Sequence, residues 1–397
     1  MNKTQEILYN ITAKVNIRGL WHTGKMDELK RILDYCESII DVEKINKKIQ
    51  KQKNCLRFEP LESVCVKIDY PNKTFTRYTM QETHDDFAKM MVNELIGALS
   101  HIESDSDGIP MIRANYGVGI LPSAFGVNCR IVNDSMPWCD SVGREGAQKI
   151  LLKGMPDIGA GFGQKVLDAY AFFKEQLSAY PKCKQAIKLY HPDYQGAFDI
   201  AHLIFGADIY LELYDDPDFV CDLMQLISQT YVRNLKFIKQ LIQDETEGYV
   251  YHWGHLFPGS VVLRDDSAVN LSKDMYNEFI APFNNQILSE FGSGSVHFCG
   301  RADQWVFEMA KQPKILGYNV GYMNTLVFGQ EYLDFIKPAY YDSKKAVVGY
   351  VLSQKDFESF DFKKYNTGVS YNLWASDKNG ANELLKRIEE KIKYEVE

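Results

Sequence analysis

The segment Gly294-Ser295-Val296-His297-Phe298-Cys299-Gly300 reads as a short buried strand with reactive side chains at its end. Residues two apart on a strand point to the same side, so His297 and Cys299 project together from its carboxyl end. An imidazole and a thiol on one face supply half of a tetrahedral zinc site. A helical pattern begins near Asp303, and a helix start favours a thiolate at Cys299. The alternative is simple packing, since a buried cysteine usually serves as a small apolar residue.

From residue 109 onward, short apolar runs rich in β-branched and aromatic residues alternate with long helical patterns. This alternation predicts parallel strands joined by crossover helices. Eight such runs in a chain of 397 residues favour a (β/α)8 barrel, the TIM barrel, over a doubly wound sheet. The runs are 109–116, 187–191, 249–253, 261–263, 296–299, 315–322, 346–351 and 368–373, and the helical patterns include 166–177, 219–242, 273–291, 304–312 and 380–394.

The first hundred residues have a different pattern. Residues 64–70 and 75–80 alternate apolar and polar around the turn Pro71-Asn72-Lys73, which predicts a β-hairpin. Residues 85–99 form an amphipathic helix. We therefore expect residues 1–100 to be an extension packed on a barrel of residues 101–397. This extension either covers the barrel mouth or forms a homodimer interface.

Composition excludes several classes of function. The net charge is −8 and no basic run is interleaved with aromatic residues, so nucleic acid is not an expected partner. No apolar stretch reaches the roughly 18 residues that span a membrane. The start of the chain lacks the apolar core of a signal peptide. Eight scattered cysteines without a C-x-x-C indicate neither a disulfide framework nor a zinc ribbon. We expect a cytoplasmic protein with mostly inert thiols.

Polar residues gather where the predicted strands end, and in a barrel this face carries the active site. They form a pocket of carboxylate, imidazole and thiolate groups that suits a small-molecule substrate. Individually, the aspartates could equally cap loops or helices. The candidates at these ends are Tyr116, Asp193, Gln195, His252, His255, Arg264, Asp265, Asp266, His297, Cys299, Arg301, Asn319 and Asn324.

Several of these segments together resemble the uroporphyrinogen decarboxylase superfamily, in conserved order along residues 105–390. The matching segments are Asp193-Tyr-Gln-Gly-Ala-Phe-Asp-Ile-Ala with Phe205-Gly206, Leu213-Tyr-Asp-Asp-Pro217, Arg264-Asp-Asp-Ser-Ala268, Leu271-Ser272 with Tyr276, Phe279 and Pro282, His297-Phe-Cys-Gly300, Ala124-Phe-Gly126 and Pro137-Trp138. The resemblance implies a single (β/α)8 barrel. One branch of the superfamily decarboxylates uroporphyrinogen III without a cofactor. The other contains zinc-dependent methyltransferases that move methyl groups between a corrinoid protein and a thiol or a pterin.

The chain departs from both branches. The arginine-rich amino-terminal motif of the decarboxylases is missing, and Arg113, Arg264 and Arg301 are few cations for an octacarboxylate. His297-Phe298-Cys299 is similar to the methyltransferase motif, yet no cysteine follows Cys299. We expect His255 to be the third zinc ligand, with Glu212 or Asp266 as weaker candidates. One thiolate fewer predicts looser binding of zinc.

The leading hypothesis is a methyltransferase that works with a corrinoid protein and a zinc-activated nucleophile. His297, Cys299 and His255 would hold the metal, and the catalytic roles are assigned to Asp193, Asp266 and Arg301. Substrate binding is assigned to Tyr116, Gln195, Arg264, Asp265, Asn319 and Asn324. Two alternatives remain: a metal-free decarboxylase in which Arg264 stabilises developing charge, and a non-catalytic protein that binds a corrinoid or tetrapyrrole.

Overall fold

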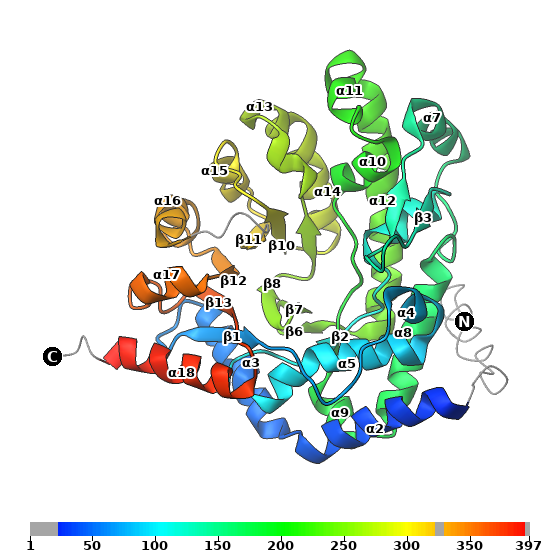
Figure 1. The fold of residues 1–397 in the computed structure, drawn as a ribbon. Helices are drawn as coiled ribbons and strands as arrows, with labels where there is room; N and C mark the ends of the chain where they lie inside the picture. Colours follow the sequence, from blue (N-terminus) through cyan, green and yellow to red (C-terminus); the bar gives the residue numbers. More distant parts are fainter. Residues whose placement is uncertain (1–22, 322–328, 394–397) are drawn as a thin grey trace.

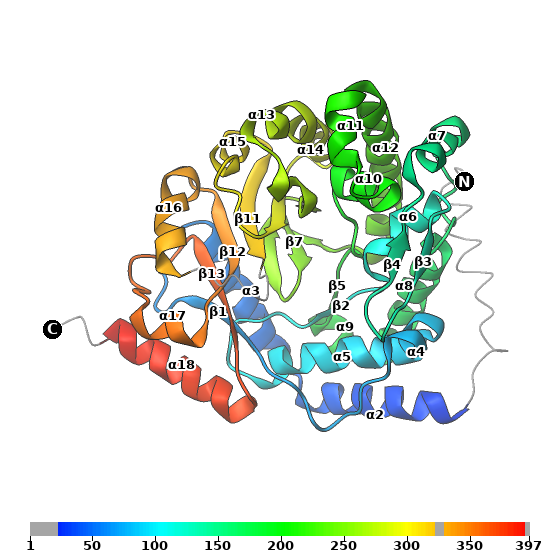
Figure 2. The same ribbon diagram turned by 45° about the horizontal axis from the view of Figure 1, so that its top comes forward.

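The computed structural model describes residues 23–321 and 329–393, with helices arranged around a central set of strands (Figure 1, Figure 2). Six strands pair in parallel in the order β1-β13-β12-β11-β10-β9. A separate parallel pair joins β2 (Met111–Ile112) and β5 (Lys188–Leu189). The six strands are β1 (Cys65–Asp69), β13 (Val369–Trp374), β12 (Ala346–Val351), β11 (Ile315–Gly321), β10 (Gly294–Cys299) and β9 (Val262–Arg264). The predicted α/β class with parallel strands is confirmed, and closure into an eight-stranded barrel stays a prediction.

The β-hairpin predicted within residues 64–80 is wrong. The first half of that segment is β1, which pairs in parallel with β13 and thereby belongs to the main sheet. The second half leads into helix α4 (Met80–Asp85), because Thr79 and Glu82 form a capping box that begins a helix there. The segment therefore contributes a strand to the sheet that carries His297 and Cys299. The division of the chain near residue 100 stays a prediction.

The run at residues 249–253 was expected to be a parallel strand and is instead part of an antiparallel sheet. In this sheet, β7 (Tyr249–His252) pairs with both β6 (Glu245–Thr246) and β8 (His255–Pro258). Trp253 and Gly254 form the two-residue turn, with φ of 49° and 80°. A positive φ at both positions is what a tight hairpin turn requires. The turn places the Trp253 ring against His297, with ring centroids 4.8 Å apart.

Several helices begin where the sequence has capping residues. Helix α12 starts after Asp216, whose side chain accepts a hydrogen bond from the Phe219 amide, with Pro217 in the first turn. The apolar residues that recur at helical spacing along α12 are buried, so this face packs on the core. The helices are α2 (Thr23–Ile39), α3 (Val42–Leu56), α4, α5 (Phe87–Glu103), α6 (Ile120–Ala124), α7 (Gly143–Lys153), α8 (Gly163–Ser178), α9 (Pro181–Ala186), α10 (Ala197–Phe205), α11 (Ile209–Asp215), α12 (Pro217–Ile242), α13 (Lys273–Met275), α14 (Ala281–Glu290), α15 (Val306–Ala310), α16 (Gln330–Tyr340), α17 (Gln354–Ser359) and α18 (Lys378–Lys393).

One extended core underlies these elements and fixes the strand ends that carry the candidate site. Apolar side chains of β10, β11 and β12, such as Val296, Tyr318 and Val348, are buried. Among the helices of residues 23–321 and 329–393, none combines the length and the hydropathy needed to cross a bilayer.

Candidate metal centre

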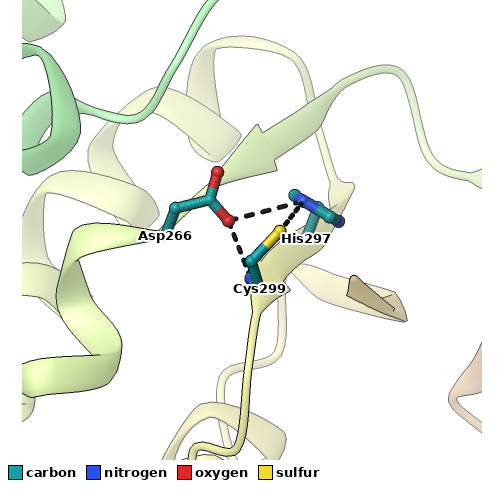
Figure 3. A group of neighbouring side chains, drawn as sticks. All are labelled: Asp266, His297 and Cys299. Atoms are coloured by element: carbon teal, nitrogen blue, oxygen red, sulfur yellow. Dashed lines mark hydrogen bonds and ion pairs between the residues drawn. The ribbon is translucent and has the colours of Figure 1, made fainter. Parts of the chain in front are cut away.

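Three potential metal ligands meet at the carboxyl ends of β9 and β10 (Figure 3). His297 and Cys299 project from one face of β10, as the sequence predicts, and Asp266 lies just after β9. The His297 Nε2 atom is 3.4 Å from the Cys299 Sγ atom and 3.4 Å from the Asp266 Oδ1 atom. Tetrahedral ligands at zinc distances of about 2.0–2.3 Å lie roughly 3.3–3.8 Å from one another. The two distances from His297 therefore fit a zinc ion, and all three donor atoms lie within 4.8 Å of one another, with a fourth position left for a substrate.

Backbone and side-chain hydrogen bonds hold Asp266 in this position. The Asp266 amide donates to the Asp199 carboxylate (2.8 Å), and so does the Ser267 amide (2.6 Å). The Asp266 Oδ1 atom accepts a hydrogen bond of 2.7 Å from the Cys299 amide. Burial, together with Asp266 and Asp265 nearby, raises the pKa of Asp199 well above its usual range. Asp199 on α10 is thus a buried carboxyl group that fixes the loop of a candidate ligand.

The ring of His297 is held in the tautomer that a metal ligand needs. Its Nδ1 atom lies 2.6 Å from the Asn319 Oδ1 atom, and the Asn319 amide nitrogen donates to the Val348 carbonyl (2.6 Å). The second bond leaves the Asn319 oxygen facing the ring, so Nδ1 carries the proton and donates it. The lone pair of Nε2 then points toward Asp266 and Cys299. Such an outer hydrogen bond is typical of metal-bound histidines.

Without a metal, burial favours the neutral forms of His297 and Cys299. Burial raises the pKa of the Cys299 thiol above its ordinary range, and Asp266 raises it further. Burial also lowers the pKa of His297, although Asp266 opposes this effect. A divalent cation reverses the balance for the thiol because it favours deprotonated ligands. The donor set, its burial and its distances therefore fit a metal site.

A buried ion network adjoins these ligands. Asp193 accepts hydrogen bonds from Arg264 and from Gln195 (2.6 Å), and it pairs with Arg113 at 3.4 Å. Burial acts to raise the pKa of Asp193, but the two arginines outweigh it and lower this pKa. The Arg264 guanidinium also lies 4.7 Å from the Trp253 ring centroid. Asp193, Gln195 and Arg264, three of the predicted site residues, are thus brought together beside His297.

Other predicted residues lie elsewhere. His255, the predicted third ligand, begins β8 outside the group of three ligand atoms, and Asp266 takes the third position instead. The reason is the Trp253-Gly254 turn, which sends the chain back along the hairpin. Glu212 pairs with Arg144 on the surface of α11. Arg301 forms an ion pair with Asp303 at 2.8 Å, away from the three ligands.

Of the remaining residues predicted to bind substrate, Tyr116, Asp265 and Asn319 have defined surroundings. Tyr116 is buried, with its ring edge-on to His84 at 4.9 Å between centroids. Asp265 accepts a hydrogen bond of 2.6 Å from Asn284, and burial raises its pKa to about 7. Asn319 orients His297. Asn324 falls outside the described residues.

Asp199 and Trp253 contribute to the site but were not predicted from the sequence. Asp199 lies within the segment that resembles the superfamily, but its hydrogen bonds to the amides of residues 266 and 267 depend on tertiary structure. Trp253 was treated as the end of a parallel strand. The Trp-Gly pair between two alternating runs was the available signal for a hairpin turn.

Comparison with known proteins finds a likeness among solved structures. No family model matches the chain, and no curated protein matches it. Among solved structures, it is similar to a methyltransferase from Methanosarcina mazei, with 13% sequence identity and a TM-score of 0.58. The match covers 87% of this chain and 98% of the other. The chain therefore shares the fold of that methyltransferase over most of its length.

Proposed function

We propose that this chain is a methyltransferase that moves a methyl group from a corrinoid protein to a thiol or pterin acceptor, with zinc held by Asp266, His297 and Cys299. The observation that carries the proposal is the group of three donors at distances that suit tetrahedral zinc. The fold shared with a methyltransferase supports it. The proposal places the reaction at the carboxyl end of a (β/α)8 barrel, where that architecture carries its active sites.

A zinc ion in this position supplies Lewis acidity, which lowers the pKa of an acceptor thiol and keeps a nucleophile available at neutral pH. The residues of the chain prepare this chemistry. Asn319 fixes the His297 tautomer, and the Cys299 amide fixes the Asp266 oxygen. With a thiol acceptor, the acceptor sulfur loses one proton and gains a methyl group. The corrinoid retains the electron pair of the cobalt–carbon bond.

Asp193 and its arginines are proposed to orient the acceptor. Because Arg264 and Arg113 lower the pKa of Asp193, its carboxylate stays ionised at neutral pH and accepts hydrogen bonds. Gln195 supports the same carboxylate. The Trp253 ring packs on both His297 and Arg264 and excludes water from that side.

The test is a methyl-transfer assay with methylcobalamin and 2-mercaptoethanol, followed by the loss of methylcobalamin absorbance. We expect the rate to fall to background in Cys299→Ala and His297→Ala. Cys221→Ala is the matched control, since Cys221 is a partly exposed cysteine on α12. An unchanged rate in a folded Cys299→Ala variant would show that zinc-based thiol activation is wrong.

A metal-free decarboxylase is the second candidate, favoured by two guanidinium groups beside Asp193. The Nε atoms of Arg113 and Arg264 are buried and have no hydrogen-bond partner among the described residues, so the two guanidinium groups keep donor capacity that the protein does not use. This candidate predicts carbon dioxide release that a chelator leaves unchanged. A non-catalytic corrinoid- or tetrapyrrole-binding protein would instead show saturable binding and no turnover in either assay.

A further inference from the structure

Two cysteines face each other across a surface hairpin that the proposed reaction does not use. Strands β3 (Asn128–Arg130) and β4 (Trp138–Asp140) pair in antiparallel fashion, beside α6 in Figure 2, and Cys129 lies directly opposite Cys139. Their Sγ atoms are 2.8 Å apart. The sequence alone does not indicate this pair, because nine residues separate the two cysteines.

The backbone is already suited to a bond between the two sulfur atoms. Directly opposite residues in an antiparallel pair have Cα atoms about 4.5–5.5 Å apart. Disulfides span Cα distances of about 4.4–6.8 Å, so the strands need not separate or slide. The sulfur atoms need to approach by only about 0.8 Å to reach the bond length of about 2.0 Å.

Access distinguishes Cys129 from its buried partner Cys139 and from most other thiols of the chain. Cys129 is partly exposed, whereas Cys36, Cys55, Cys65 and Cys183 are buried in the core. The hydrogen bond with Cys139, followed by burial, raises the pKa of Cys129. The thiolate fraction is therefore small at neutral pH, and slow exchange is expected.

The hairpin lies against the segment that carries Tyr116. The Cys129 Sγ atom is 3.7 Å from the Gly119 carbonyl oxygen. A Cβ atom at Gly119 would lie 3.0 Å from the Cβ atom of Cys129, and one at Gly117 would lie 3.2 Å from Pro137. Because the hairpin packs this closely on the loop after β2, we expect a change in the mobility of the hairpin to change the mobility of that loop.

We propose that Cys129 and Cys139 form a reversible thiol–disulfide site whose oxidant is a low-molecular-weight disulfide such as glutathione disulfide. The Cys129 thiolate attacks one sulfur of the small disulfide and releases one small thiolate. The Cys139 thiolate then attacks Cys129 in the mixed disulfide and releases the second. The protein loses two protons and two electrons, and the small disulfide is reduced to two thiols. The bond closes a ring through residues 129–139 and stiffens the hairpin over the Tyr116 segment.

The test is oxidation of the full chain with glutathione disulfide, followed by alkylation under denaturing conditions and peptide mapping. We expect a linked Cys129–Cys139 peptide, lighter by two hydrogen atoms, that dithiothreitol reverses. Amide exchange across residues 128–140 should slow by roughly tenfold or more in the oxidised form.

Variants make the outcome decisive. In Cys139→Ser, Cys129 should accumulate as a mixed disulfide with glutathione, since no second thiol can displace it; Cys139→Ala repeats the test if the serine variant does not fold. Cys221 is partly exposed on a separate helix and is the internal control. Its reaction with glutathione disulfide should stop at the mixed disulfide. Full alkylation of both hairpin cysteines after oxidation would overturn the proposal. A stable mixed disulfide at Cys129 in the unaltered chain would overturn it as well.

Discussion

Replacing Gly321 by alanine should damage the metal centre with a single added carbon atom. Gly321 ends β11, next to the carboxyl end of β10, and pairs with Cys299 in register. A Cβ atom there would lie 2.5 Å from the His297 Cε1 atom and 2.6 Å from the Cys299 Sγ atom. Both contacts are shorter than side-chain carbon atoms tolerate, so both candidate ligands have to move.

The size of the effect follows from these two distances. Reaching an ordinary contact of about 3.4 Å requires displacements of about 0.8–0.9 Å. Zinc sites tolerate deviations of about 0.2 Å in their ligand distances. Disturbing the support of a ligand costs about 10- to 100-fold in metal affinity. We expect at least that loss, which corresponds to about 1.4–2.7 kcal/mol of binding free energy.

The assay is a zinc titration against a chromophoric chelator, with circular dichroism as the test of folding. Gly97→Ala is the matched control, because the nearest heavy atom to a Cβ there is 3.8 Å away and Gly97 lies in helix α5. It should leave zinc affinity unchanged. A folded Gly321→Ala protein with the zinc affinity of the unaltered chain would refute the geometric reasoning.

Substitutions at three further positions test the surroundings of the metal ligands. Asn319→Leu removes the acceptor for His297 Nδ1 and should weaken zinc binding by about 10- to 100-fold in the same titration. Asn319→Asp retains an acceptor and should bind zinc more tightly than the leucine variant does. Arg264→Leu leaves the buried carboxylate of Asp193 with one arginine fewer and should lower the free energy of unfolding by about 3–5 kcal/mol in urea denaturation at pH 7; a change below 1 kcal/mol would contradict a buried ion pair. Burial raises the pKa of Asp265 to about 7, above the value of about 3.9 in an unfolded chain, so the metal-free protein should lose up to roughly 4 kcal/mol of stability as pH rises from 4 to 7. Asp265→Asn should flatten that dependence in urea denaturation with chelator present, and an equally steep profile in this variant would count against it.

The parts of the fold that sequence predicts well are those with strong local signals. The predicted runs at 296–299 and 346–351 are strands β10 and β12, and the helical pattern at 219–242 is part of α12. The period-2 spacing of His297 and Cys299 correctly placed both side chains on one face. In each case the local pattern agrees with the tertiary structure.

The errors arose where distant segments decide the outcome. Residues 65–69 alternate as a hairpin strand does, yet their partner is β13, about three hundred residues away in sequence. His255 has the side chain of a zinc ligand, but the turn at Trp253-Gly254 directs it into β8. Asp266 lies among the ligands because a hydrogen bond to Asp199 fixes its backbone. No local sequence pattern predicts this contact.

The most direct test of the central claim is the metal content of the purified chain, measured by inductively coupled plasma mass spectrometry alongside Cys299→Ser and Cys221→Ser. The account predicts about one zinc ion per chain in the unaltered protein and in Cys221→Ser, with nearly complete loss in Cys299→Ser, because structural and catalytic zinc sites depend on each ligand. The account is contradicted if the folded, unaltered protein remains free of zinc after dialysis against micromolar zinc and does not differ from Cys299→Ser in zinc content.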